Sequence, residues 1–395
     1  MISGRALAVE QEELEQLNYQ EYLSSLGASD QETDELINYN KNVFRREDAG
    51  CGLALPLPDE PFMEAWEGYA QEAGEKGAFN TLREKLVQLS FPVREGISRD
   101  DHYRAATLRG LPAAGLPGAE GLQLDRPGDL ELCLHQTPAG RIPVLTVPHR
   151  PDFITLVQAL SRRNEPEKIP ESMGACMVKG FNNWDRIRAY REKWEKANPG
   201  RCTGEDWREE FRNIVPRREL YQDTFIILSR EEYSGVPAIE LGLSPEEWRS
   251  LSLIIRREHE AAHYFTLRVF GSARNHAYDE LIADCMGIVA AAGTYRPDWF
   301  LRFVGLENYP RYRQGGRLEN YLGSPPLSDG AFRILQALVY RASENVEKIC
   351  RGVCAGADTP EGKAGLLLSL AGMSLIDLAS MSPSQQSIGG ERALT

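Results

Sequence analysis

Cysteine is scarce in this chain, and the 7 that occur are scattered over 395 residues. An odd and dispersed set of this kind is a poor basis for the disulfide framework of a small secreted protein. Cys350 and Cys354 stand four residues apart rather than in a C-x-x-C pair, and no second pair exists that would complete a structural zinc site. Cys285 is expected to pack as a small apolar side chain.

Basic charge is also in short supply. The chain has 45 Lys and Arg against 58 Asp and Glu, which gives a net charge of −13. Because proteins bind nucleic acid largely by neutralising phosphates with cationic side chains, this balance predicts that nucleic acid is not a partner. Neither G-x-G-x-x-G nor a phosphate-binding P-loop occurs in the sequence, so no dinucleotide or nucleotide cofactor is expected.

Long apolar runs are missing as well. The most apolar stretch, 364–381, is interrupted by Ser369, Ser374 and Asp377, which favours a buried C-terminal helix over a membrane span. The first residues lead into an acidic segment and contain no apolar core of a signal peptide. These observations predict a cytoplasmic protein that has no membrane partner.

One motif stands out against this background. Residues 259–263 read His-Glu-Ala-Ala-His, which is an H-E-x-x-H motif. On a helix, positions i and i+4 share one face, so His259 and His263 can bind one metal ion together. Glu260 would then project beside the metal, where it can take a proton from a bound water.

The sequence around the motif predicts a helix over 245–270. Ser244 suits an N-cap, Pro245 suits the first helical position and Gly271 suits the C-terminal stop. Both motif histidines fall on the apolar stripe of this helix, so they are expected to face the interior. Two core histidines satisfied by hydrogen bonds are the alternative interpretation.

A second, alanine-rich helix is expected to follow a short turn and to end near Ala292. A turn of this length favours antiparallel packing of the two helices. Glu280 and Asp284 lie at i and i+4 on the second helix. Glu280 is the candidate for the third ligand that catalytic zinc requires, and Asp284 is the candidate to hydrogen-bond the far nitrogen of a ligating histidine.

Three residues near the start of the second helix offer other roles. His276 competes with Glu280 for the third ligand position, although we favour Glu280. His276, Tyr278 and Arg274 are also candidates for donors to the substrate or to an oxyanion. The alternative for each of the three is an ordinary role at the start of a helix.

H-E-x-x-H followed by a helix that carries E-x-x-x-D resembles the gluzincin branch of zinc metallopeptidases, the thermolysin-like group. The resemblance covers residues 259–284. It implies Glu260 as the general base and Asp284 as the partner of a ligating histidine. It also implies three ligands for Zn²⁺, namely His259, His263 and Glu280. The spacing between His263 and Glu280 is somewhat shorter than is usual in that group.

The remaining segments predict a mainly helical α+β chain that combines a small β-sheet with a zincin-like metal-binding helix pair. Strands are expected over 130–136, 142–147 and 221–228. Residues 169–184 are expected to form a loop that can serve as a ligand surface, with Asn183 either in that surface or as a helix cap. Four regions are expected: a helical N-terminal region (1–106), a mixed α/β region with a hairpin (107–215), the metal-binding domain (216–345), and a C-terminal helix with a flexible tail (346–395).

Together these features predict a zinc-dependent hydrolase that cleaves a peptide or a small amide, with Glu260 as general base. Two alternatives remain open. One is a catalytically silent zincin-like binding protein that keeps a metal. The other is a carboxylate/histidine non-haem iron enzyme, because Glu260 and His263 match half of a helical di-iron site, although no second E-x-x-H occurs in the chain.

Overall fold

The computed structural model describes residues 2–41, 44, 53–201, 203–272, 276–353 and 359–381. Contacts along the backbone divide the chain into two compact units. The first comprises residues 1–56 and 233–395 and is called the motif unit below, because it contains the H-E-x-x-H sequence. The second comprises residues 57–232 and is called the sheet unit.

All regular elements that the structure describes in the motif unit are helices. Its α-helices are α1 (Ile2–Ser25), α2 (Asp30–Tyr39), α9 (Pro245–Phe270), α10 (Ala277–Ala292), α11 (Pro297–Val304), α12 (Asp329–Val353), α13 (Pro360–Ala371) and α14 (Leu375–Ser380). Three 3-10 turns accompany them: η5 (Tyr233–Gly235), η6 (Ala238–Leu241) and η7 (Arg317–Tyr321). The flexible tail expected at the C-terminus lies outside the described residues from residue 382 onward.

Helix α9 confirms the helix predicted around the motif, with the same bounds. The Ser244 side chain accepts the backbone N–H of Glu247, Pro245 occupies the first turn, and Gly271 ends the helix with a φ of 66°. A positive φ at this position is favourable for glycine because it has no Cβ to clash with the backbone.

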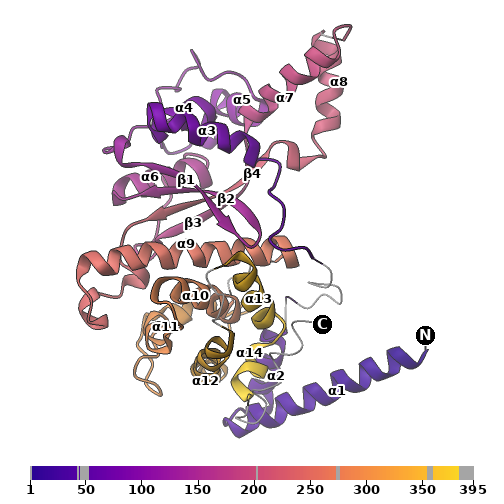
Figure 1. Cartoon of the computed structure of the whole chain (residues 1–395), viewed down its shortest axis with the longest axis vertical. Helices are drawn as coiled ribbons and strands as arrows, with labels where there is room; N and C mark the ends of the chain where they lie inside the picture. The colour runs from indigo at the N-terminus through magenta and orange to yellow at the C-terminus, as the bar shows by residue number, and fades with distance from the viewer. Residues whose placement is uncertain are drawn as a thin grey trace. The chain divides into compact units, whose positions relative to one another are not determined.

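Helices α9 and α10 are antiparallel neighbours, as the short connection predicted (Figure 1). A Cβ built on Gly287 of α10 would lie 2.7 Å from the backbone oxygen of Ile255 on α9. Only a residue without a side chain permits so close an approach. The contact brings the facing sides of the two helices within reach of short side chains.

The sheet unit contains one four-stranded sheet with the order β1-β2-β4-β3. The strands are β1 (Glu131–Thr137), β2 (Gly140–Val147), β3 (Ala175–Asn182) and β4 (Gln222–Ser229). β1 and β2 form an antiparallel hairpin, β2 and β4 are parallel, and β4 and β3 are antiparallel. The helices of this unit are α3 (Met63–Lys76), α4 (Ala78–Lys85), α5 (Asp101–Arg109), α6 (Arg150–Ser161), α7 (Trp184–Ala197) and α8 (Gly204–Ile214), and its 3-10 turns are η1 (Val87–Ser90), η2 (Ile97–Arg99), η3 (Pro127–Asp129) and η4 (Arg218–Leu220).

Apolar side chains from α3, α4 and α6 join the sheet in one core that includes Trp66, Leu82 and Phe153. The three strands expected from the sequence all form, within two residues of their predicted bounds. The chain is thus α+β and mainly helical, with a small mixed sheet.

Two expectations require correction. The loop expected over 169–184 contains strand β3, which pairs with β4 through a register shift between Val178 and Phe181. The glycine within that shift, Gly180, has a φ of 65°, and such a bulge hides the alternation of a regular strand. Asn183 is an N-cap, since its side chain accepts the N–H groups of Asp185 and Arg186.

The second correction concerns the regions. The motif domain was expected to start at residue 216, but β4 belongs to the sheet unit and the motif unit resumes at Tyr233. Residues before 57 belong to the motif unit rather than to a separate N-terminal region. None of the helices that the structure describes is both long and apolar enough to cross a membrane.

Candidate metal centre

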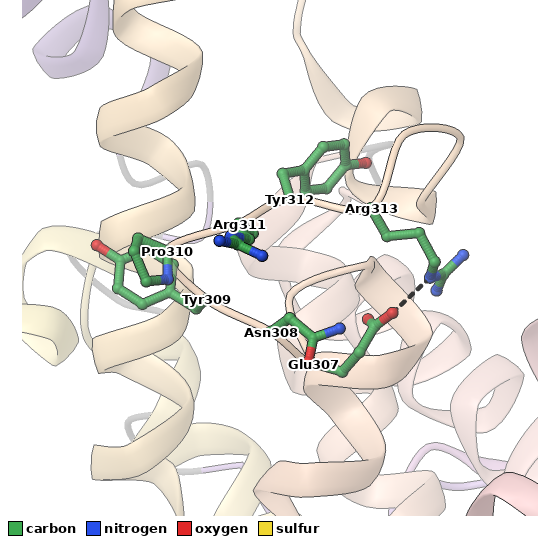
Figure 2. Close-up of a pocket in the computed structure, with 7 residues that line it drawn as sticks. All are labelled: Glu307, Asn308, Tyr309, Pro310, Arg311, Tyr312 and Arg313. Atoms are coloured by element: carbon green, nitrogen blue, oxygen red, sulfur yellow. Dashed lines mark hydrogen bonds and ion pairs between the residues drawn. The ribbon is translucent and has the colours of Figure 1, made fainter.

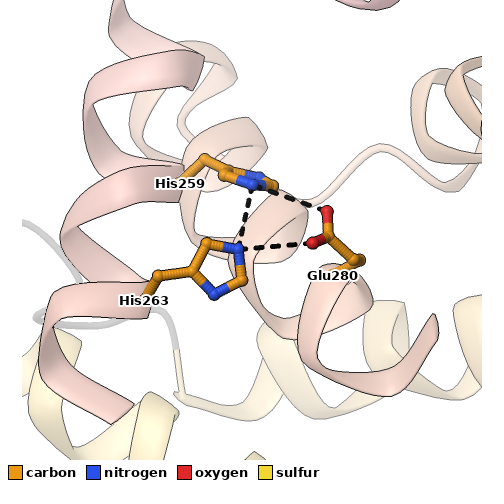
Figure 3. Close-up of side chains that lie close together, drawn as sticks. All are labelled: His259, His263 and Glu280. Atoms are coloured by element: carbon orange, nitrogen blue, oxygen red, sulfur yellow. Dashed lines mark hydrogen bonds and ion pairs between the residues drawn. The ribbon is translucent and has the colours of Figure 1, made fainter. Parts of the chain in front are cut away.

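Three side chains meet between α9 and α10. His259 and His263 come from α9 and Glu280 comes from α10, and their ligand atoms all lie within 4.8 Å of one another (Figure 3). The Nε2 atoms of the histidines are 3.1 Å apart. Glu280 Oε2 lies 3.6 Å from His259 Nε2, and Oε1 lies 3.5 Å from His263 Nε2.

These spacings match those of ligands around a single ion. Two atoms bonded to a tetrahedral zinc at 2.0–2.1 Å lie about 3.3 Å apart. The donor set, two imidazoles and one carboxylate, is also the set found in many catalytic zinc sites. The three residues thus fit a metal in both geometry and chemistry.

The far nitrogen of His259 is held by Asp284. Nδ1 lies 2.8 Å from Asp284 Oδ1 and 3.0 Å from the hydroxyl of Tyr233, which itself donates to the same carboxylate oxygen at 2.6 Å. Burial would raise the pKa of Asp284, but the charge of Arg317 and the hydrogen bonds from His259 and Tyr233 lower it. The ionised carboxylate therefore accepts a hydrogen bond from the Nδ1–H group of His259. With the proton on Nδ1, the lone pair of Nε2 faces the cluster.

His263 has a corresponding partner in Asp279, a residue that the sequence analysis did not select. Nδ1 of His263 lies 3.5 Å from Asp279 Oδ1, and the Asp279 side chain is 1% exposed. Burial opposes a charge on His263, yet contacts with Asp279 and Glu280 raise its pKa well above the ordinary value. In the metal-free protein a proton on His263 can thus occupy the space between the two Nε2 atoms.

Three further residues support the cluster. Tyr233 lies in η5, and Arg317 and Tyr321 lie at the two ends of η7. Arg317 contacts Asp284 Oδ2 and donates to the Tyr233 hydroxyl, and the Tyr321 hydroxyl donates to Glu280 Oε2 at 3.0 Å. No pattern in the sequence singles these residues out, because they are distant from the motif along the chain and lie in short turns.

Glu260 differs from its neighbours on α9. Its side chain is partly exposed, whereas His259 is buried. Within the described part of the chain, Glu260 makes no hydrogen bond and no ion pair. Among the described residues, no side chain therefore competes with a water molecule or a substrate for the carboxylate next to the first histidine.

The other candidates near the start of α10 have different partners. His276 caps α10, since its Nδ1 accepts the N–H of Tyr278 and its Nε2 lies 2.9 Å from the backbone oxygen of Tyr39. Tyr278 is buried and donates its hydroxyl proton to the backbone oxygen of Leu370. Glu280 joins the histidine pair, and His276 is not in that group. Arg274 lies outside the described residues.

Two other features of the described residues are weaker candidates for a site. In the sheet unit, Asp125, His149 and Asp152 lie close enough to hold an ion, but both oxygens of Asp152 already accept backbone N–H groups. In the motif unit, residues 307–313 line a shallow pocket of about 640 Å³ (Figure 2). A single loop forms this pocket, and its half-buried acid, Glu307, is paired with Arg313 at 2.6 Å.

Comparison with protein families places the chain in one of them. A model described as a family of unknown function, DUF7005, matches residues 21–382, so the chain belongs to that family. No curated protein and no solved structure matches the chain. A statement about activity must therefore come from the chemistry of the site itself.

Proposed function

We propose that this protein is a zinc-dependent hydrolase of the gluzincin type, in which His259, His263 and Glu280 hold Zn²⁺. One observation carries the proposal: two imidazole nitrogens and a carboxylate converge at ligand spacings, while each far imidazole nitrogen faces an aspartate. Helices α9 and α10 would then be the zincin-like helix pair. The proposed substrate is a peptide or a small amide, hydrolysed in the cytoplasm.

The zinc ion, when bound, would lower the pKa of a coordinated water and polarise the carbonyl of the scissile bond. Glu260 is positioned next to the ligand His259 and has no competing partner among the described residues. It would accept a proton from the attacking water and pass that proton to the leaving nitrogen. Asp284 and Asp279 would keep the Nδ1 protons in place, so that both Nε2 lone pairs stay directed at the ion.

The donor set favours a second candidate as well. Two histidines and one carboxylate, with the other coordination positions of the ion left open, also suit non-haem iron(II). An iron enzyme is therefore the alternative that the same three ligands allow. A catalytically silent metal protein is a further alternative. Glu260, which has no partner among the described residues, argues against it, because a purely structural metal does not require a base.

Metal analysis of the purified protein separates these possibilities. We expect about one zinc per chain in the wild type, loss of zinc in His263→Ala, and retained zinc in Glu260→Gln. Glu260→Gln should then serve as the inactive control in a screen of peptides and small amides. Iron in place of zinc would favour the iron enzyme, and a wild type that binds neither metal would leave two buried core histidines and refute the hydrolase.

A further inference from the structure

The turn η7 reaches two of the carboxylates at the cluster, Asp284 and Glu280. Arg317 begins the turn and contacts Asp284, and Tyr321 ends it and contacts Glu280. Asp284 and Glu280 stand one turn apart on α10, and the two η7 residues have the same spacing along the chain. One short element outside the α9–α10 pair thus contacts two of the acidic groups of the centre.

The two oxygens of Asp284 have different partners. Oδ2 receives the guanidinium, and Oδ1 receives His259 Nδ1 and the Tyr233 hydroxyl. Asp284 is fully buried, so an unpaired charge there would be unfavourable. With Arg317 in place, the carboxylate plane is fixed and Oδ1 is held toward the histidine.

Arg317 also contacts the ring of Tyr233. Its guanidinium lies 5.4 Å from the centre of the Tyr233 ring, and the guanidinium of Arg256 lies 5.5 Å from the same centre. Cations at this distance are attracted to the face of an aromatic ring. The Tyr233 hydroxyl is thereby held at the point where it meets both His259 and Asp284.

Tyr321 acts on the other carboxylate. The Tyr321 hydroxyl donates a hydrogen bond to Glu280 Oε2 at 3.0 Å. One of the lone pairs of Oε2 is occupied by this bond, whereas no hydroxyl of the described residues donates to Oε1, which lies 3.5 Å from His263 Nε2. Oε1 is therefore the oxygen of Glu280 that is better placed to serve as a single ligand atom.

The position of η7 is itself constrained. A Cβ on Gly316, the residue before Arg317, would lie 2.7 Å from the backbone oxygen of Val304, and a Cβ on Gly305 would lie 2.9 Å from the Cα of Gly316. The two ends of the connection from α11 to η7 are thus in direct backbone contact. This closure holds Arg317 and Tyr321 in a fixed place beside α10.

We propose that Arg317 and Tyr321 are positioning residues that set the geometry of the metal centre from η7. Arg317 orients Asp284 and, through it, His259. Tyr321 restrains Oε2 of Glu280, so that Glu280 binds through one oxygen and the ion keeps an open position for water. This inference rests on the proposed metal site, and it assigns to η7 the control of how Glu280 coordinates the ion.

The test uses the full chain loaded with zinc or with cobalt(II). Zinc affinity is measured by competition with a chromophoric chelator in the wild type, Arg317→Met, Arg317→Lys and Tyr321→Phe. Loss of a group that supports a metal ligand typically weakens metal binding by about 10- to 100-fold. We expect a loss in this range for Arg317→Met and a smaller loss for Arg317→Lys, because lysine can reach Asp284 but cannot bridge to Tyr233 as well.

The cobalt spectrum supplies a readout that a general loss of stability would not change. Four-coordinate cobalt(II) absorbs visible light more strongly than five-coordinate cobalt(II). Tyr321→Phe removes only one hydroxyl and frees Oε2, so we expect Glu280 to bind through both oxygens and the absorbance per cobalt to fall. Phenylalanine preserves the ring, and Arg317→Lys preserves a cation, so these two variants carry the test if Arg317→Met does not fold.

Matched controls come from the neighbouring loop (Figure 2). Arg311 is exposed, and its side chain has no hydrogen bond or ion pair with any described residue. The Tyr309 ring stacks on Tyr340 at 4.5 Å, which does not depend on its hydroxyl. Arg311→Met and Tyr309→Phe should retain wild-type affinity and the wild-type spectrum.

The outcomes separate the inference from the proposed function. A wild type without affinity for zinc or cobalt would refute both. A wild type that binds metal, with Arg317→Met and Tyr321→Phe indistinguishable from it in affinity and spectrum, would overturn the role of η7 and leave the metal site standing. Equal losses in the control variants would also overturn that role, because they would indicate a general effect of the loop.

Discussion

The Nε2 atoms of His259 and His263 face each other at 3.1 Å. Each far nitrogen lies beside an aspartate: Asp284 Oδ1 is hydrogen-bonded to His259 Nδ1 at 2.8 Å, and Asp279 Oδ1 faces His263 Nδ1 at the ion-pair distance of 3.5 Å. Two lone pairs directed at each other repel unless a proton or a cation lies between them. The pair is therefore arranged for competition between a proton and a metal.

The first prediction concerns this competition. The pKa of His263 is raised well above 6.5, so its extra proton must leave before zinc binds. Zinc affinity should therefore keep increasing as the pH rises above 6.5, and binding should release a proton. Isothermal titration calorimetry in buffers of different ionisation enthalpy measures that release. An affinity that stays constant from neutral to alkaline pH would contradict the arrangement.

The second prediction concerns the stability of the metal-free protein. Despite burial, contacts with His263, His259 and Arg317 lower the pKa of Glu280 below its ordinary value of 4.5. The ionised Glu280 therefore stabilises the folded protein above pH 4.5, and this stabilisation is lost as the pH falls below that value. The raised pKa of His263 has the opposite effect on stability. Protonated His263 stabilises the folded protein below pH 6.5, and this stabilisation is lost as the pH rises through the pKa of the folded state.

Melting temperatures of the chelator-treated protein, measured by calorimetry over a range of pH, test both effects. We expect the wild type to lose stability at the acidic and the alkaline end. His263→Ala should remove the alkaline decline that belongs to this residue. An alkaline decline of the same size in wild type and His263→Ala would assign that decline to other groups.

The third prediction concerns the contact of α10 with α9. Gly287→Ala would place a methyl group 2.7 Å from the backbone oxygen of Ile255, so the two helices must separate. Overpacking of this kind destabilises a protein by about 1–3 kcal/mol, and the separation should also weaken zinc binding. Denaturant unfolding and chelator competition measure the two effects.

Gly365→Ala is the matched control for Gly287→Ala. Gly365 also lies within a helix of the motif unit, α13, but a Cβ there would meet no atom within 4 Å. Alanine is the better helix former by roughly 0.8–1.0 kcal/mol, so this variant should be neutral or more stable. Equal destabilisation of both variants would show that the contact with Ile255 is not the cause.

The fourth prediction concerns Asp279. Asp279→Asn removes the charge that faces His263 Nδ1 while it keeps the size of the side chain. We expect zinc affinity to fall by about 10- to 100-fold, the usual effect of losing a carboxylate that supports a ligating histidine. Asp298→Asn, at an exposed pair with Arg296, should leave the affinity unchanged. Unchanged affinity in Asp279→Asn would mean that Asp279 does not orient His263.

Much of this site could be anticipated from local sequence. Ser244, Pro245 and Gly271 set the bounds of α9 through capping, which depends only on neighbouring residues. The i, i+4 spacing then placed the two histidines on one face, and the short turn led α10 back beside α9. The placement of Glu280 and Asp284 opposite the histidines follows from that antiparallel pairing.

Other parts depended on contacts between distant segments. His276 and Tyr278 looked suitable as donors near the site, but Tyr39 and Leu370 bind them instead, and no local pattern predicts those partners. Strand β3 was missed because its register shift interrupts the alternation from which a strand is predicted.

The sequence by itself determined the helix, the spacing of its histidines and the type of donor at each position, because short-range geometry controls all three. Only the tertiary structure decided which groups support those donors. Arg317, Tyr321 and Tyr233 reach the centre from turns that local propensity does not specify. Their places follow from the burial of charged groups, since Asp284 and Glu280 can remain ionised inside the protein only where cations and hydrogen-bond donors from elsewhere in the chain meet them.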